Sequence, residues 1–72
     1  MNKIPISFDY KGQHYEGHFN EMLGKTHWHL MINNFYCGAL LFTQRGFAFH
    51  SNSGQFEDMV DEFADLIMLW YE

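Results

Sequence analysis

The fold is decided by residues 55–71, QFEDMVDEFADLIMLWY. Apolar residues recur there at spacings of three and four, the period of one face of an α-helix; they are Phe56, Met59, Val60, Phe63, Leu66, Ile67 and Trp70. The other side carries only acidic charges, on Glu57, Asp58, Asp61, Glu62 and Asp65. We therefore predict an amphipathic helix with one face on a core and an acidic face in water. Asn52 or Ser53 is expected to cap its N-terminus.

The residues before this helix alternate between apolar and polar side chains, which is the period of half-buried strands. Strands are expected at about 3–10, 13–22, 27–33, 35–43 and 47–51. Turns at Lys11-Gly12 and Gly24-Lys25 place large apolar residues of the first three strands on one face, namely Ile4, Ile6, Phe8, Tyr10, Tyr15, Phe19, Leu23, Trp28, Leu30 and Ile32. The sequence thus predicts an α+β fold in one domain of residues 1–72. It is a five-stranded antiparallel β-meander with one C-terminal α-helix packed on one face.

The fourth strand is apolar on both faces, and two turns assign its core face differently. A two-residue turn at Asn33-Asn34 would direct Phe35, Cys37, Ala39 and Leu41 to the core. The turn at Arg45-Gly46 would instead match Leu40 with Phe49 and Phe42 with Phe47. We favour a longer or bulged connection at residues 33–35. It would make the core-facing residues Tyr36, Leu40, Phe42, Phe47 and Phe49.

Composition excludes several classes of partner. The formal net charge is −5, and most of the nine acidic residues lie in the last sixteen positions. Nucleic-acid binding needs a basic surface, so no direct nucleic-acid partner is expected. No run approaches the roughly 20 apolar residues of a membrane span, and a lone cysteine, Cys37, fits a reducing compartment. We expect a cytoplasmic protein with no membrane partner.

No catalytic or cofactor signature is present, and we expect neither an enzyme nor a cofactor. Cys37 lies in an apolar run, where a thiol packs as a small inert group. His27 and His29 form an H-x-H pair with His18 diagonal to His29 across the hairpin, a spacing that suits a transition metal. His14 or Glu16 would complete such a shell. Solvated histidines on a polar sheet face need no metal, so a metal site remains the second alternative function.

Surplus apolar residues point to an interface. Residues 66–71 are apolar all round, and the outer side of the fourth strand is apolar too. Contiguous exposed apolar surface normally marks an interface. We predict a protein-interaction module that binds itself, as a homodimer, or another protein through Ala39, Leu41, Met68, Leu69 and Tyr71. The first alternative is an acidic inhibitor whose helix face, Glu57, Asp58, Asp61, Glu62 and Asp65, docks on a basic nucleic-acid-binding protein.

Overall fold

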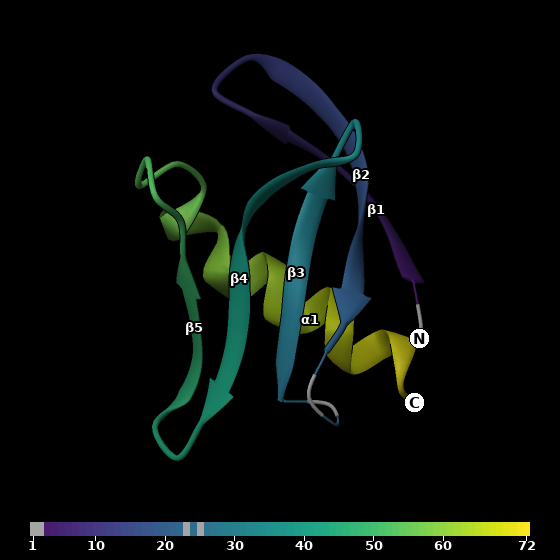
Figure 1. Cartoon of the computed structure of the whole chain (residues 1–72), viewed down its shortest axis with the longest axis vertical. Helices are drawn as coiled ribbons and strands as arrows, with labels where there is room; N and C mark the ends of the chain where they lie inside the picture. Colours follow the sequence, from purple (N-terminus) through teal and green to yellow (C-terminus); the bar gives the residue numbers. More distant parts are fainter. Residues whose placement is uncertain (1–2, 23, 25) are drawn as a thin grey trace.

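The computed structural model describes residues 3–22, 24 and 26–72, and it has the predicted fold. Five antiparallel strands lie in chain order in one sheet, followed by a 3-10 turn and an α-helix (Figure 1). The elements are β1 (Lys3–Tyr10), β2 (Gln13–Glu21), β3 (His27–Ile32), β4 (Phe35–Thr43), β5 (Gly46–His50), η1 (Glu57–Met59) and α1 (Val60–Trp70). Within the described residues, no helix has the length and apolar character that a membrane crossing requires.

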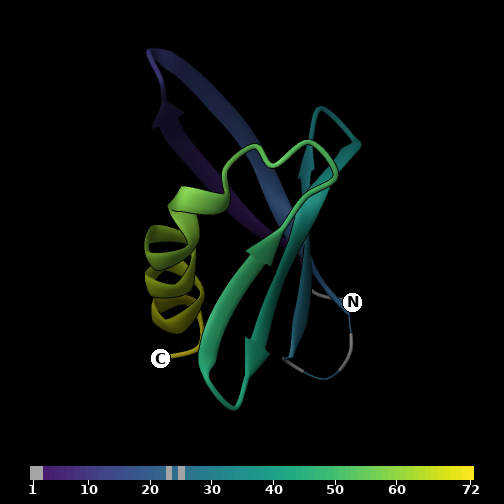
Figure 2. The same cartoon turned by 90° about the vertical axis from the view of Figure 1, so that its left-hand side faces the viewer.

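The sheet curls toward the helix, which lies across one of its faces (Figure 2). We call this the covered face and the opposite one the uncovered face. The core lies between the covered face and the helix, with Phe63 near its centre. Its ring meets those of Phe8, Phe19 and Phe49 at centroid distances of 5.2, 5.4 and 5.2 Å. All three are edge-to-face contacts, an arrangement that aromatic pairs prefer.

The registers of the first two hairpins confirm the prediction. Phe8 pairs with Tyr15, and Phe19 pairs with both Ile4 and Leu30. Lys11 and Gly12 have positive φ angles of 49° and 81°, as a tight two-residue hairpin turn requires. Two residues of the second predicted turn region, Leu23 and Lys25, lie outside the described residues.

Strand β4 combines a tight turn with a later bulge, so the predicted bulge at residues 33–35 was wrong. Asn33 and Asn34 have φ angles of 53° and 67° and form a two-residue turn, because asparagine tolerates the left-handed region. The register then shifts, since Leu30 pairs with Gly38 but Met31 pairs with Tyr36. Cys37 is therefore the extra residue of a bulge inside the strand.

Because of this extra residue, the alternation of side chains between the two faces of the sheet is out of step before and after Cys37. Leu40 and Phe49 are buried on the covered face, as predicted. Tyr36 was predicted to be a core residue, but it is half exposed on the uncovered face, and its ring contacts that of His29 at 5.0 Å. Gly38 lies where a Cβ atom would be 2.6 Å from Phe49 Cζ, so a side chain there would displace the Phe49 ring.

The helix begins later than predicted. Phe56 has a left-handed φ of 70°, residues 57–59 form a 3-10 turn, and the α-helix starts at Val60. No side chain caps either start, so the predicted caps Asn52 and Ser53 were wrong. A positive φ at Phe56 is incompatible with a helix running through it. It turns the Phe56 ring back into the core.

The last turn of the helix also differs from the prediction. Trp70, expected to face the sheet, is 47% exposed. Tyr71, expected to be outside, is partly buried. Its hydroxyl accepts a hydrogen bond from Trp28 Nε1 at 3.3 Å and donates one to Glu21. The buried residues of the helix are Phe63, Ala64 and Ile67, and Trp70 lies at the edge of the face that they form.

Candidate functional site

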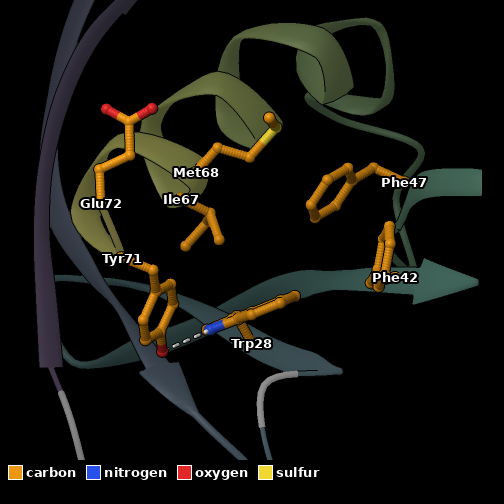
Figure 3. A pocket seen from close by; sticks show the side chains of 7 residues that line it. All are labelled: Trp28, Phe42, Phe47, Ile67, Met68, Tyr71 and Glu72. Carbon is orange, nitrogen blue, oxygen red and sulfur yellow. Dashed lines mark hydrogen bonds between the residues drawn. The ribbon is translucent and has the colours of Figure 1, made fainter.

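A groove opens on the covered face between the C-terminal half of α1 and the β4–β5 hairpin (Figure 3). Its volume is about 420 Å³. We call it the apolar groove, and its lining residues are Trp28, Phe42, Phe47, Ile67, Met68, Tyr71 and Glu72. Glu72 is the one charged residue among them. The lining is therefore apolar with an acidic end.

Four elements, β3, β4, β5 and α1, position the groove. Trp28 of β3 forms its floor and is held by the hydrogen bond to Tyr71. Phe42 and Phe47 pair across β4 and β5 and form one wall, with their ring centroids 4.9 Å apart. The other wall is the helix, from which Met68 points toward Phe47 (Figure 3). Because floor and walls belong to paired strands and a packed helix, the groove is part of the fold and needs no loop to form it.

Two facing residues of the groove are unusually exposed. Phe42 is 52% exposed and Met68 is 57% exposed, whereas Trp28 below them is buried. Single exposed apolar residues are ordinary on a soluble protein. Two that flank one hollow above an aromatic floor form a concave apolar surface of the kind that ligands and partner side chains occupy.

The predicted interface residues are divided between the two faces of the sheet. Ala39 and Leu41 are half-buried on the uncovered face, where they pair with His50 and Ala48 of β5. Met68 and Leu69 are exposed on the helix, on the other side of the sheet. The structure therefore does not join them into one patch. Tyr71 lies in the groove, partly buried.

The sequence missed the strand side of the groove. Phe42 and Phe47 were expected in the core together with Trp28. Phe47 is partly buried against the core, whereas Phe42 is 52% exposed. Their position next to the β4–β5 turn is the sequence signal that they lie at the margin of the sheet. The helix does not cover this margin.

The uncovered face carries the histidines that suggested a metal. His18, His27 and His29 are half-buried there, opposite Met31, Leu41 and Ala39 of neighbouring strands. Within residues 3–22, 24 and 26–72, no three His, Cys, Asp or Glu side chains are grouped so that they could hold a metal ion. The geometry gives no ligand shell to the H-x-H pair.

His14 belongs to a different cluster, near the β1–β2 turn. Its Nδ1 atom lies 2.7 Å from Asp9 Oδ1, and its Nε2 atom lies 3.6 Å from Glu16 Oε2. The hydrogen bond from the imidazole to Asp9 raises the pKa of His14, and the negative charges of Asp9 and Glu16 add to this effect. The three side chains of the cluster are exposed. It reads as a surface pair across the hairpin.

The acidic helix face is exposed as predicted, at Glu57, Asp58, Asp61, Glu62 and Asp65. Asp58 accepts a hydrogen bond from the Tyr10 hydroxyl at 2.8 Å, and Glu57 accepts one from the Ser51 N–H at 3.4 Å. In the described part of the chain, no lysine or arginine lies within ion-pair distance of these five carboxylates. The face keeps its negative charge.

Comparison of the chain with protein-family models, with curated proteins and with solved structures finds no match.

Proposed function

We propose that this protein is a small cytoplasmic interaction module that receives an apolar segment of another protein in the apolar groove. One observation carries the proposal: Phe42 and Met68 flank a hollow whose floor is the buried Trp28. The lining holds one carboxyl group, Glu72, and one phenol, Tyr71, whose hydroxyl is already hydrogen-bonded to Trp28 and Glu21. We therefore propose binding rather than catalysis, with no role for nucleic acid or membrane.

The energetics favour a partner side chain in the groove. Burial of apolar surface contributes about 25 cal/mol per Å², and aromatic residues around a desolvated pocket supply most of the binding energy at many interfaces. Trp28, Phe42 and Phe47 are such residues. Because Trp28 is already buried and hydrogen-bonded, binding orders only the exposed Phe42 and Met68 side chains, which keeps the entropic cost low.

The test is capture of a partner from an extract of the native cell by three forms of the protein. These are wild type, the double variant Phe42→Ser/Met68→Ser, and the matched control Phe35→Ser. Phe35 is 74% exposed but lies at the other end of β4, so its loss removes exposed apolar area outside the groove. A partner that is bound by wild type and the control but lost by the double variant supports the proposal. A partner retained by all three forms contradicts it.

Sedimentation of the same three forms tests whether the occupant is a second copy of the chain. Self-association that only the double variant loses would identify the groove as a homodimer interface.

The second candidate function is docking of the acidic helix face on a basic nucleic-acid-binding protein. The specific observation is that five exposed carboxylates have no lysine or arginine partner in the described part of the chain. The triple variant Glu57→Gln/Asp58→Asn/Glu62→Gln separates the two candidates. It should abolish capture if the acidic face is the site, and leave capture intact if the groove is.

A further inference from the structure

We propose that the partner segment is basic, with a large apolar side chain that enters the apolar groove between lysine or arginine residues. This inference rests on the proposed function, because it names the partner of the same groove. Its basis is the placement of carboxylates along the helix wall.

The acidic row beside the groove follows from helix geometry. Asp61, Asp65 and Met68 are spaced by four and three residues, so they lie on one side of α1. Met68 lines the groove, which places the two exposed carboxylates on the same edge. Glu72 lines the groove itself. From Asp61 to the end of α1 at Trp70 the acidic edge extends over roughly 14 Å, at 1.5 Å per residue, and Glu72 lies just beyond that end.

The basic groups of the described chain do not cancel this field. Arg45 lies in the β4–β5 turn beyond Phe42 and Phe47, and among the described residues it is the one lysine or arginine on the β4–β5 hairpin and α1. Lys11 is at the β1–β2 turn, with its Nζ 5.3 Å from the centroid of the Tyr10 ring, and Lys3 begins β1. In the part of the chain that the structure describes, three carboxylates against one guanidinium leave the groove edge negative.

This charge selects among the possible occupants. Two copies of a chain with net charge −5 repel each other, and an acidic segment would meet like charge along the helix. A basic segment is attracted over a long range and held in register by the acidic edge. The charge pattern therefore favours a basic partner over a second copy.

The size of the groove sets the size of the segment. A volume of about 420 Å³ is at the lower end of the range of small-ligand pockets and suits one or two large side chains. An extended chain advances about 3.4 Å per residue, so five or six residues match the acidic edge. The minimal ligand is a short peptide with a central apolar pair and basic ends.

The experiment is an NMR titration of the ¹⁵N-labelled protein with two capped hexapeptides, Lys-Arg-Phe-Leu-Arg-Lys and Glu-Asp-Phe-Leu-Asp-Glu. Both contain the same apolar pair, so a difference in affinity reports the charge. We expect the basic peptide to bind at least about tenfold more tightly at low salt. Its shifts should map to the Trp28 indole N–H and to residues 67–72. The preference should shrink at high salt because screening weakens exposed charge pairs.

Two charge variants locate the effect. Asp61→Asn/Asp65→Asn should weaken binding of the basic peptide at least threefold. The control Glu57→Gln/Glu62→Gln removes the same charge from one residue that precedes α1 and one that lies off the row, and should weaken binding less. Equal effects of the two variants would mean that overall charge is responsible, and would overturn the inference.

The remaining outcomes separate this inference from the proposed function. Equal binding of both peptides in the groove overturns the basic partner and leaves the groove as a binding site. Binding of neither peptide, or shifts on the uncovered face, also overturns the inference, while the capture experiment judges the groove independently. A homodimer that Met68→Ser dissociates would show that the occupant is a second copy, and overturn it as well.

Discussion

Two aromatic groups lie on the same face of the sheet, and only one of them is closed. The closed cluster consists of Phe8, Tyr10, Tyr15, Phe56 and Phe63. Phe56 meets the rings of Phe8, Tyr10 and Tyr15 at 5.2, 4.8 and 5.1 Å, and both Phe56 and Phe63 are fully buried. The apolar groove has aromatic residues of the same kind, but Phe42 remains half exposed.

The difference comes from what covers each group. The β1–β2 hairpin folds over the start of the helix and brings Phe8 and Tyr15 against Phe56 (Figure 2). At the other end, the helix terminates at Trp70 and no described segment lies over Phe42 and Phe47. Similar residues therefore have different exposures. The closed cluster is packed into the core, and the groove leaves part of its apolar surface exposed.

The largest effect should come from opening the closed cluster. Phe63→Ala removes a ring that contacts Phe8, Phe19 and Phe49. Truncation of a buried phenylalanine costs about 3 to 5 kcal/mol, which is close to the whole stability expected of so small a domain. We expect this variant to be unfolded at 25 °C by circular dichroism. A cooperative thermal transition near that of wild type would show that Phe63 is not central to the core.

A smaller effect is expected at the floor of the groove. Tyr71→Phe removes the hydroxyl that accepts from Trp28 and donates to Glu21. The loss should reduce the free energy of unfolding by about 1 kcal/mol, measured by urea denaturation. Trp70→Phe, at a half-exposed position, is the matched control and should change stability less. If the control were the more damaging change, the helix end would be packed as the sequence predicted.

Truncation in the groove should hardly affect stability. Phe42→Ala removes a ring that is 52% exposed, so the expected cost is under about 1 kcal/mol. The same urea measurement should leave this variant near wild type while partner capture falls. A loss as large as that of Phe63→Ala would mean that the groove is part of the core.

The smallest effect concerns the hairpin that closes the cluster, where His14 pairs with Asp9 beside Phe8 and Tyr15. The folded-state pKa of His14 lies above its usual 6.5. Its contribution to stability is therefore present below that value and is lost as the pH rises through the folded pKa. His14→Gln should lower the melting temperature slightly at pH 5.5 and leave it unchanged at pH 8.5. NMR titration of the imidazole gives the pKa directly, and Asp9→Asn should lower it.

The sequence predicted the architecture because its signals are local. Alternation along the strands and the turn at Lys11-Gly12 set the β1–β2 register, which pairs Phe8 with Tyr15 as expected. The predicted position of the bulge, at residues 33–35, was wrong. Its actual position at Cys37 depends on the Phe49 ring, which lies against Gly38. The sequence did not predict that Tyr71 is partly buried and Trp70 exposed, because the position of Tyr71 depends on its hydrogen bond with Trp28 of β3.

The groove was only partly predicted, because it depends on the tertiary placement of the helix on the sheet. The predicted helix and α1 end one residue apart, at Tyr71 and Trp70, so the length of the helix does not explain the opening at Phe42. Met68 and Tyr71 were named as interface residues from their surplus apolar character, whereas Phe42 and Phe47 were assigned to the core.

The most direct test of the groove as the partner site compares two neighbouring residues of β4. Phe42 faces the groove and Leu41 faces the uncovered side of the sheet. A photoreactive phenylalanine analogue at either position, illuminated in the native cell, reports what lies against each face. We predict a cross-linked partner of defined mass from position 42 and none from position 41. Cross-linking from position 41 alone would contradict the account and make the uncovered face the functional surface.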